Sequence, residues 1–404
     1  MADIPKIRFK GFTEPWEQRK LGDIYGSIGN AFVGTATPYY AEHGHFYLES
    51  NNVKDGQINH NAEIFINDEF YEKQKDKWLH TGDMVMVQSG HVGHAAVIPE
   101  ELDNTAAHAL IMFRNPKEEI EPYFLNYEYQ TDKAKKQIEN ITTGNTIKHI
   151  LASDMQEFVV DIPKYEEQKA IAGYFCKLDH LITLHQRKCD DTKKLKKYML
   201  QKMFPKNGEK FPEIRFKGFT EAWEQRKLGE VFKEYSEKNH TELPALTIIQ
   251  GGGTVKREES DRNLMYDESN LSNYKMVRKD DFIVHLRSFE GGLEKSLLDG
   301  IISPAYHTFH SDVADSRFYY PYFRSHEFIK HKLVPHVYGI RDGRSIDIAG
   351  MKTIEIPYTS IEEQRKIGDY LESLDHLITL HQRKCDTLKE LKKYMLQNMF
   401  PKKG

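Results

Sequence analysis

The chain lacks the features that would place it in a membrane or outside the cell. No apolar run approaches the roughly 20 residues of a membrane-spanning helix, and the first ten residues, MADIPKIRFK, contain no hydrophobic signal region. The cysteines, Cys176, Cys189 and Cys385, form no CxxC pair, which favours reduced thiols. We therefore expect a cytoplasmic protein with no membrane partner.

An excess of positive charge is also missing. The formal net charge of the 404 residues is −4 at pH 7, and 39% of the residues are hydrophobic, as in ordinary globular proteins. Proteins that bind nucleic acids through a general electrostatic attraction are usually basic. Any DNA-binding surface on this chain must therefore come from local clusters of side chains.

The sequence contains none of the common motifs of nucleotide-dependent catalysis. It has no GxxxxGK[ST] or GxGxxG loop, and no NPPY- or DPPY-type tetrapeptide of an adenine methyltransferase. A loose nuclease-like string, Asp161 with Glu167 and Lys169, runs into a predicted helix instead of lying on neighbouring strands. No cysteine or clustered carboxylate completes a zinc set with either histidine pair, His43 with His45 or His91 with His94. We predict a chain that is not an enzyme and binds no metal or cofactor itself.

The most informative feature present is an internal repeat. The segment IRFKGFTEPWEQRKLG at residues 7–22 returns at residues 214–229 with a single change, and LDHLITLHQRKCD at residues 178–190 returns unchanged at residues 374–386. The spacing between copies falls from 207 to 196 residues, so the second insert is 11 residues shorter. A period near 200 residues is far longer than a solenoid repeat of roughly 20–50 residues. The pattern indicates one duplicated frame that carries two different inserts.

Each repeated C-terminal part predicts one long helix. The first begins after Pro163 and the second after Pro357, and both place glutamates in the first turn, where the helix dipole favours them. A helix of about 38 residues is about 57 Å long. Apolar residues recur every seven positions in both helices, and a third apolar column adjoins two heptad columns.

This stripe predicts an antiparallel coiled coil of the two helices, with apolar surface left for a partner. The alternative is that each helix packs only on its own globular domain. His185 and His381 occupy matched positions, which favours hydrogen-bonded interface histidines over a metal site or a proton switch. The predicted helix–helix and partner interface consists of Ile171, Phe175, Leu178, Leu181, Ile182, His185 and Leu195, and of Ile367, Leu371, Leu374, Leu377, Ile378, His381 and Leu391.

The inserts differ in sequence but share one order of predicted elements. In each, a strand after an acidic turn runs into a glycine loop, and a helix, a polar loop and a last strand follow. These elements are residues 84–89, 89–98, 121–139, 142–150 and 158–163 in the first insert, and residues 282–288, 288–298, 319–333, 338–348 and 353–357 in the second.

We therefore predict the α+β class, with two globular domains joined by two long antiparallel helices in a pseudo-twofold repeat. The predicted boundaries are 1–160 and 207–358 for the globular domains and 161–206 and 359–404 for the helices. The repeated frame segments, 1–22 and 213–229, open the two globular domains.

The loops of both inserts are rich in side chains that contact DNA in other proteins. Arginine pairs with guanine, asparagine with adenine and glutamate with cytosine, while glycine lets backbone N–H groups approach phosphates. Any one such residue is more often a solvated loop residue, so the hypothesis depends on the clusters. The candidates are Ser89, Gly90, His91, Gly93, His94, Gly144, Asn145, Thr146, Lys148 and His149 in the first insert, and Arg287, Ser288, Glu290, Arg341, Asp342 and Arg344 in the second.

These motifs make the chain resemble, over its whole length, the DNA-specificity subunits of Type I restriction–modification enzymes. The resemblance is carried by WEQRKLG at Trp16 and Trp223, SGHVG at residues 89–93, TTGNTIKHI at residues 142–150, and EEQ at Glu166 and Glu362. The second insert departs from the glycine pattern, since it has SFEGG and GIRDGRSI in the corresponding places.

The resemblance implies that each insert is a target recognition domain for one half of an asymmetric, bipartite site in double-stranded DNA. It implies that the helices set the separation of the halves. It also implies two methyltransferase subunits that carry S-adenosylmethionine and modify adenine N6, and two restriction subunits that use ATP and Mg. The alternative is a coiled-coil adaptor that assembles proteins without DNA readout, which the salt dependence of DNA binding would distinguish.

Overall fold

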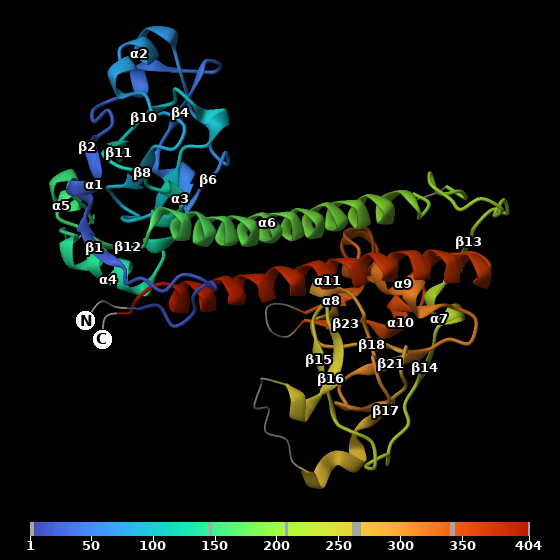
Figure 1. Cartoon of the computed structure of the whole chain (residues 1–404). Helices are drawn as coiled ribbons and strands as arrows, with labels where there is room; N and C mark the ends of the chain where they lie inside the picture. The colour runs from blue at the N-terminus through green and yellow to red at the C-terminus, as the bar shows by residue number, and fades with distance from the viewer. Residues whose placement is uncertain (1–3, 145–147, 207–208, 261–267, 340–343, 403–404) are drawn as a thin grey trace. The chain divides into compact units, whose positions relative to one another are not determined.

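The computed structural model describes residues 4–144, 148–206, 209–260, 268–339 and 344–402. The chain folds into two compact units. The first unit combines Met1–His185 with Arg383–Gly404, and the second unit is Gln186–Gln382. In Figure 1 the first insert runs from blue to green and the second from yellow to orange.

The long helices α6, Tyr165–Lys202, and α11, Ile361–Met399, confirm the helices predicted from the repeat (Figure 1). The boundary between the units falls within both helices, so each unit contains the N-terminal half of one and the C-terminal half of the other. Each compact unit therefore consists of one insert and half of each long helix.

The first unit is built on an antiparallel sheet with strand order β2–β11–β8–β9. A smaller sheet of order β10–β4–β7–β3, a β5–β6 hairpin and a β1–β12 pair complete its strands. The strands are β1 Glu17–Lys20, β2 Tyr25–Asn30, β3 Tyr40–Ala41, β4 His45–Leu48, β5 Val53–Lys54, β6 Gln57–Ile58, β7 Phe65–Ile66, β8 Met84–Val87, β9 Ala95–Val97, β10 Ala106–Ala107, β11 Leu110–Pro116 and β12 Val159–Ile162.

The second unit has a corresponding antiparallel sheet with strand order β14–β21–β18–β19. The hairpins β15–β16 and β22–β23 and the pairs β17–β20 and β13–β24 surround it. The strands are β13 Glu224–Lys227, β14 Lys233–Tyr235, β15 Leu246–Ile249, β16 Gly253–Lys256, β17 Lys275–Val277, β18 Phe282–Val284, β19 Glu294–Lys295, β20 Gly300–Ile302, β21 His307–His310, β22 Val337–Tyr338, β23 Ser345–Ile346 and β24 Glu355–Tyr358. Mixed strands and helices in both units confirm the predicted α+β content.

The short helices correct two sequence predictions. The single helix expected at residues 121–139 is divided into α3 and α4 because the Thr131 side chain accepts the Ala134 N–H and starts a new helix. The helix expected at residues 319–333 is α9 followed by a π-helical segment, η7. The helices are α1 Leu21–Ile24, α2 Asp68–Glu72, α3 Pro122–Glu128, α4 Asp132–Ile141, α5 Ala152–Gln156, α7 Leu228–Val231, α8 Ser288–Gly291, α9 Ser316–Phe323, η7 Glu327–Leu333 and α10 Ile348–Met351.

The core of each unit is completed by the end of a long helix from the other copy of the repeat. In the first unit, Trp16 packs edge-on against Phe400, with ring centroids 5.9 Å apart. In the second unit, Trp223 packs against Phe204 in the same way, at 6.0 Å. The repeated segments WEQRKLG and MFPK thus contact each other in both units, through the tryptophan of the first and the phenylalanine of the second.

The EEQ motifs hold the repeated N-terminal segments on the long helices. The Arg8 guanidinium donates two hydrogen bonds of 2.6 Å to the buried carboxylate of Glu167, which raises the pKa of Arg8. The side chain of Gln168 accepts the N–H of Glu121 and donates to the carbonyl of Pro163. The same contacts recur in the second unit, where Arg215 pairs with Glu363, and Gln364 bonds Asp315 and Thr359.

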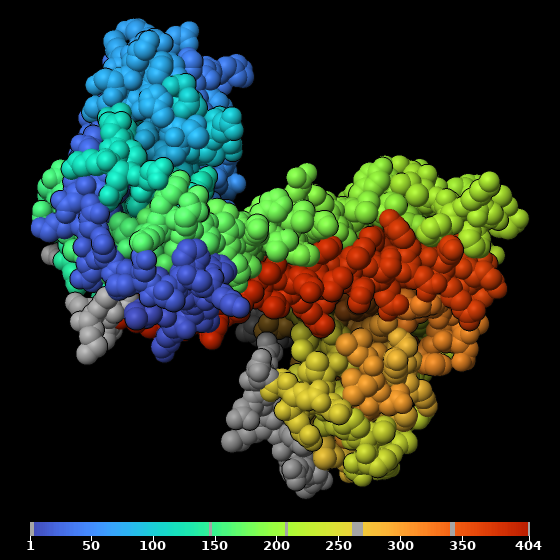
Figure 2. Space-filling view, viewed as in Figure 1, coloured from blue at the N-terminus to red at the C-terminus, as the bar shows by residue number. Residues whose placement is uncertain are grey.

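The long helices run antiparallel within each unit. In the first unit, Lys392 lies 2.7 Å from Asp179, and Cys385 lies 3.9 Å from the carbonyl of Ile182. In the second unit, the equivalent pair is Lys196 with Asp375, whose two carboxylate oxygens lie 2.5 and 2.7 Å from the lysine Nζ. Residue numbers fall along one helix as they rise along the other, which defines the antiparallel direction. The adjoining surfaces of α6 (green) and α11 (red) are visible in Figure 2.

The predicted apolar stripe divides into a buried and an exposed part. The buried part packs into the cores of the units and comprises Ile171, Phe175 and Leu178 with Ile367, Leu371 and Leu374. The column of Leu181, Leu195, Leu377 and Leu391 is 39–42% exposed, so it does not lie between the helices as a heptad seam would. The reason is that each helix turns its buried apolar residues toward the core of an insert, which leaves the leucine column facing outward.

Candidate nucleic-acid interface

In the first unit, the predicted glycine loop and the predicted polar loop lie side by side. The Gly90 N–H donates to the carbonyl of Lys148 at 3.1 Å, and the Ile150 N–H donates to the carbonyl of Gln88 at 2.9 Å. A further β-bridge joins Ser89 to His149. The loop of residues 88–94 and the hairpin that ends at His149 therefore form one surface.

This surface brings together most of the first-insert candidates. It contains Ser89, Gly90, His91, Gly93, His94, Gly144, Lys148 and His149, whereas the predicted Asn145 and Thr146 lie outside the described residues. Gly90 and Gly93 have φ angles of 80° and 87°, which favour glycine. A Cβ atom on Gly93 would also come within 2.8 Å of Ile138, so this glycine lets α4 approach the loop.

His94 is held as a directed hydrogen-bond donor. Its Nδ1 accepts the backbone N–H of Asp55 at 3.3 Å, so the proton of the neutral ring is on Nε2. Burial lowers the pKa of His94, which favours the neutral ring near pH 7. A fixed N–H donor beside a glycine loop is suited to an acceptor on a base edge or a phosphate.

Lysines of the insert and of α11 line a hollow of about 530 Å³ next to the same loop, together with Asp55, Asp132 and Glu139. Gly93 and His94 form part of its wall, and Lys135 of α4 and Lys389 and Lys393 of α11 face it. These three lysines are exposed, whereas Lys392 pairs with Asp179. Lys389 and Lys393 of the frame helix are thus placed beside the loop of the insert, where they can neutralise phosphates.

In the second unit, the glycine loop and the polar hairpin also lie side by side, but they carry different side chains. The loop after β18 turns into the short helix α8, and the guanidinium of Arg344 lies 5.1 Å from the ring centroid of Phe289. Arg344 precedes β23, so the β22–β23 hairpin lies beside this loop. Arg341 and Asp342 lie outside the described residues.

The remaining second-insert candidates have distinct environments. Arg287 and Glu290 are exposed, as base or phosphate contacts require. Ser288 is fully buried, and its hydroxyl accepts the N–H of His285 at 2.9 Å, so it stabilises the turn from within. Burial, together with the charges of Arg324 and Arg287, lowers the pKa of His285 to about 4.

Sequence reasoning missed residues that join this surface from a distant hairpin. The side chain of Gln250 covers Gly291, and Arg324, just after α9, touches the same hairpin. The signal available in the sequence was the run of three glycines at residues 251–253, between two β-patterned stretches.

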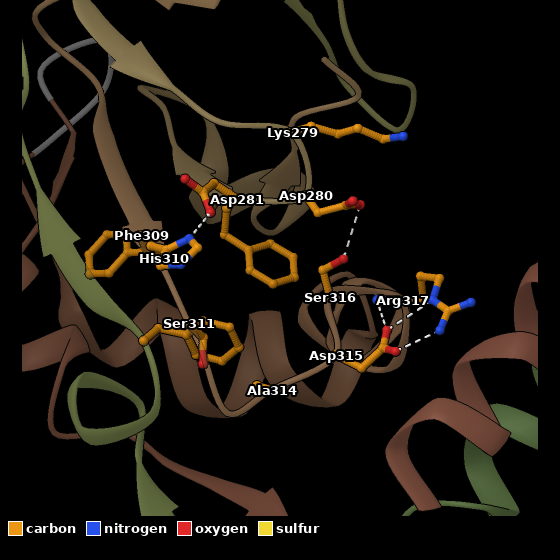
Figure 3. Close-up of a pocket in the computed structure, with 12 residues that line it drawn as sticks. Lys279, Asp280, Asp281, Phe309, His310, Ser311, Ala314, Asp315, Ser316 and Arg317 are labelled. Carbon is orange, nitrogen blue, oxygen red and sulfur yellow. Dashed lines mark hydrogen bonds and ion pairs between the residues drawn. The ribbon is translucent and has the colours of Figure 1, made fainter. Parts of the chain in front are cut away.

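A separate hollow of about 240 Å³ lies at the opposite end of β18 (Figure 3). Two ion pairs lie in its wall, Asp281 with His310 and Asp315 with Arg317. The hydroxyl of Ser316 donates to Asp280 at 3.2 Å. Asp281 precedes β18 whereas the candidate loop follows this strand, so the hollow is not part of the candidate interface.

The nuclease-like string has a structural explanation. Asp161 accepts hydrogen bonds from Lys133 and Gln18, and Glu167 is bound by Arg8. Across the residues that the structure describes, no group of three or more metal-ligating side chains is brought together. Among the same residues, no helix is both long and apolar enough to cross a membrane.

Comparison with known proteins assigns the family. The model of the Type I restriction modification DNA specificity domain matches the chain twice, at residues 13–193 and 220–390. The chain therefore belongs to the family of Type I restriction–modification DNA-specificity proteins. Each match covers one insert together with most of the long helix that follows it.

Relatives and a solved structure match nearly the whole chain. The chain is 23% identical over 402 residues to the Type I restriction enzyme MjaVIII specificity subunit of Methanocaldococcus jannaschii, covering 95% of this chain and 91% of that protein. It is 24% identical over 413 residues to the putative MjaX specificity subunit of the same organism, covering 98% and 95%. The fold is similar to the crystal structure of the S subunit from M. genitalium, with a TM-score of 0.61, 16% identity and coverage of 99% and 100%.

Proposed function

We propose that this chain is the sequence-specific DNA-binding subunit of a Type I restriction–modification complex. Each recognition domain reads one half of an asymmetric, bipartite target in double-stranded DNA. One observation carries this proposal: in both units, a loop after the central strand lies beside a polar hairpin, although the letters of the loops differ. Because the repeated frame is the same in both units and the loops have different side chains, the two units are suited to a target whose two halves differ in sequence.

The long helices act as an antiparallel coiled-coil spacer with pseudo-twofold symmetry. Support comes from the pairs Lys392–Asp179 and Lys196–Asp375, which are equivalent under the repeat and join the same two helices in each unit. A helix of about 57 Å can span one turn of DNA, roughly 34 Å. The length of the helices then sets the separation of the half-sites.

The chemistry resides in partner subunits. This chain has no motif for a nucleotide or a methyl donor, so two methyltransferase subunits supply S-adenosylmethionine and methylate adenine N6. Two restriction subunits supply ATP hydrolysis with Mg. The chain itself is not catalytic.

Exposed apolar side chains at equivalent positions support docking of two equal partners. In the first unit Leu181, Leu391 and Tyr394 are 39%, 39% and 56% exposed, and in the second unit Leu377, Leu195 and Tyr198 are 41%, 42% and 51% exposed. We name these sets the first and the second frame patch. Apolar side chains that recur on two frames are suited to one type of partner that binds twice.

The test is to co-express the chain with its methyltransferase and sequence the methylated DNA. We expect one asymmetric, bipartite motif. Replacing residues 22–160 by the corresponding insert of a relative should change one half of the motif and preserve the other. A change of both halves would contradict the modular function, and methylation that ignores the insert would favour the coiled-coil adaptor.

A further inference from the structure

The hairpin formed by β15 and β16 in the second unit has an exposed tip. Gln250, Gly251 and Gly252 lie at the turn, and all three are exposed. The two strands pair in regular antiparallel register from Leu246–Lys256 to Ile249–Gly253. The tip is therefore the outward end of an ordered hairpin.

A buried carboxylate fixes this tip. Glu294 on β19 is fully buried, and it accepts the backbone N–H groups of Gly251 at 2.7 Å and of Gly253 at 3.3 Å. The hydroxyl of Tyr320 donates to the same carboxylate at 2.9 Å, and Arg324 forms an ion pair with it. A buried charge bonded by this many donors holds the tip in one position.

The tip also meets the candidate recognition loop. A Cβ atom on Gly291 would lie 2.3 Å from the amide nitrogen of Gln250, so glycine is needed for the side chain of Gln250 to cross that loop. A Cβ atom on Gly251 would lie 3.0 Å from the guanidinium of Arg324. Gln250, an exposed residue, therefore lies beside the loop that carries the exposed residues Arg287 and Glu290.

The first unit has a corresponding arrangement made of different amino acids. There the tip of the β5–β6 hairpin holds Asp55 and Gly56, and the Asn126 side chain donates to the Gly56 carbonyl at 2.8 Å. A Cβ atom on Gly56 would come within 2.3 Å of the Gln130 amide nitrogen. His94 of the first recognition loop accepts the N–H of Asp55.

The supporting helices match as well. Asn126 and Gln130 are four residues apart in and after α3, as Tyr320 and Arg324 are in and after α9. A hairpin tip is thus placed beside the recognition loop in both units. The side chains that support the tip differ between the two units, but they stand at the same positions of the supporting helix.

We infer that the β15–β16 tip is a further DNA-reading segment of the second domain, and that Gln250 is a specificity-determining residue that reads an adenine. This inference rests on the proposed function. A glutamine amide can donate to adenine N7 and accept from adenine N6 in the major groove. The backbone N–H groups of Gly251, Gly252 and Gly253 are bonded within the protein, so the side chain of Gln250 is the group at this tip that is offered to DNA. Glu294 and Arg324 are positioning residues, because the first is inaccessible and the second is bound to it.

The experiment uses the full chain with its methyltransferase and compares methylated motifs. Gln250→Ala should lower discrimination at one adenine of the second half-site by about 5- to 150-fold and leave the first half-site unchanged. Gln250→Glu should shift that position toward cytosine, because a carboxylate accepts from cytosine N4. Asp55→Ala, at the matching tip, is the control and should leave the second half-site unchanged.

Two measurements separate reading from stability. The melting temperature and the assembly with methyltransferase should be the same for Gln250→Ala as for the wild-type chain. An unchanged motif in both Gln250 variants, or an equal loss at every position of both half-sites, would overturn the inference. If the wild-type complex gave no bipartite motif, the proposed function itself would fail, which is a different result.

Discussion

The guanidinium of Arg8 donates two 2.6 Å hydrogen bonds to the carboxylate of Glu167, 159 residues away in the sequence. The side chain of Glu167 is 2% exposed and that of Arg8 is 13% exposed. Arg215 and Glu363 repeat the pair in the second unit, at 2.6 and 2.8 Å. The pair connects the repeated N-terminal segment to the start of the long helix.

Removing one partner of this pair should be costly. Arg8→Ala leaves the Glu167 carboxylate buried without its cation, and we expect the free energy of unfolding to fall by about 3–5 kcal/mol. Denaturant unfolding measures the change. Lys20→Ala, which breaks the exposed pair with Glu157, is the control and should change the free energy of unfolding far less, because exposed ion pairs contribute little. Equal effects of the two variants would contradict the assigned role of the buried pair.

The two recognition surfaces should act on different halves of the target. Arg344→Ala should relax the second half-site by roughly 1–3 kcal/mol if its guanidinium contacts a base, and His94→Ala should affect the first half-site alone. Methylation sequencing of each variant is the measurement. Arg187→Ala, on an exposed face of α6, should change neither half. If Arg344→Ala altered the first half-site, the independence of the two surfaces would be wrong.

The lysines beside the first recognition loop should contribute affinity without specificity. Replacing Lys389 or Lys393 with Gln should lower the slope of log K against log salt by about 1 for each lost phosphate contact. The methylated motif should stay the same. Titration of DNA binding at several salt concentrations measures the slope. An unchanged slope with reduced affinity would argue against phosphate contact.

The frame patches should each bind one methyltransferase. Leu391→Asp with Tyr394→Asp disrupts only the first frame patch, because the aspartates would have to be desolvated in an apolar contact. We expect a complex with a single methyltransferase subunit, measurable by native mass spectrometry. Leu195→Asp with Tyr198→Asp should give the same stoichiometry, and both pairs together should prevent assembly. Retention of two subunits in the combined variant would exclude these patches as docking sites.

Acid should destabilise the second unit through His285. Its pKa is lowered to about 4 in the folded chain, compared with about 6.5 when unfolded. Between these values the unfolded chain binds more protons, so stability falls as the pH falls from about 6.5 to about 4. His285→Asn removes this titration. The melting temperature of the wild-type chain should therefore decline more steeply between pH 7 and pH 5 than that of the variant, and parallel declines would refute the assignment.

Sequence reasoning succeeded where the signal is periodic or repeated. The long helices follow from heptad spacing without an internal proline, and the repeated segments predicted a shared frame. Periodicity alone could not show which apolar column packs into a core and which remains exposed, because Leu178 and Leu181 are both leucines of the same heptad pattern. Only the three-dimensional packing places Leu178 in the core and Leu181 at the surface.

Local competition and long-range contacts explain the other differences. The strong helix formers after Thr131 suggested one continuous helix, but the threonine hydroxyl caps a new one. The network of Glu294 with Gly251 and Arg324 joins residues 43 and 30 positions apart. No spacing rule connects such positions, so the glycine run could indicate the hairpin but not its position beside the recognition loop.

The contact between Trp16 and Phe400 has a consequence for synthesis on the ribosome. Trp16 emerges among the first residues, yet Met399 and Phe400, which complete its core, are translated after the whole second insert. The second core needs no such delay, because Phe204 precedes Trp223 by only 19 positions. We therefore expect the nascent first domain to remain incomplete until translation is nearly finished, while the later domain can close first, which reverses the usual N-terminal-first order.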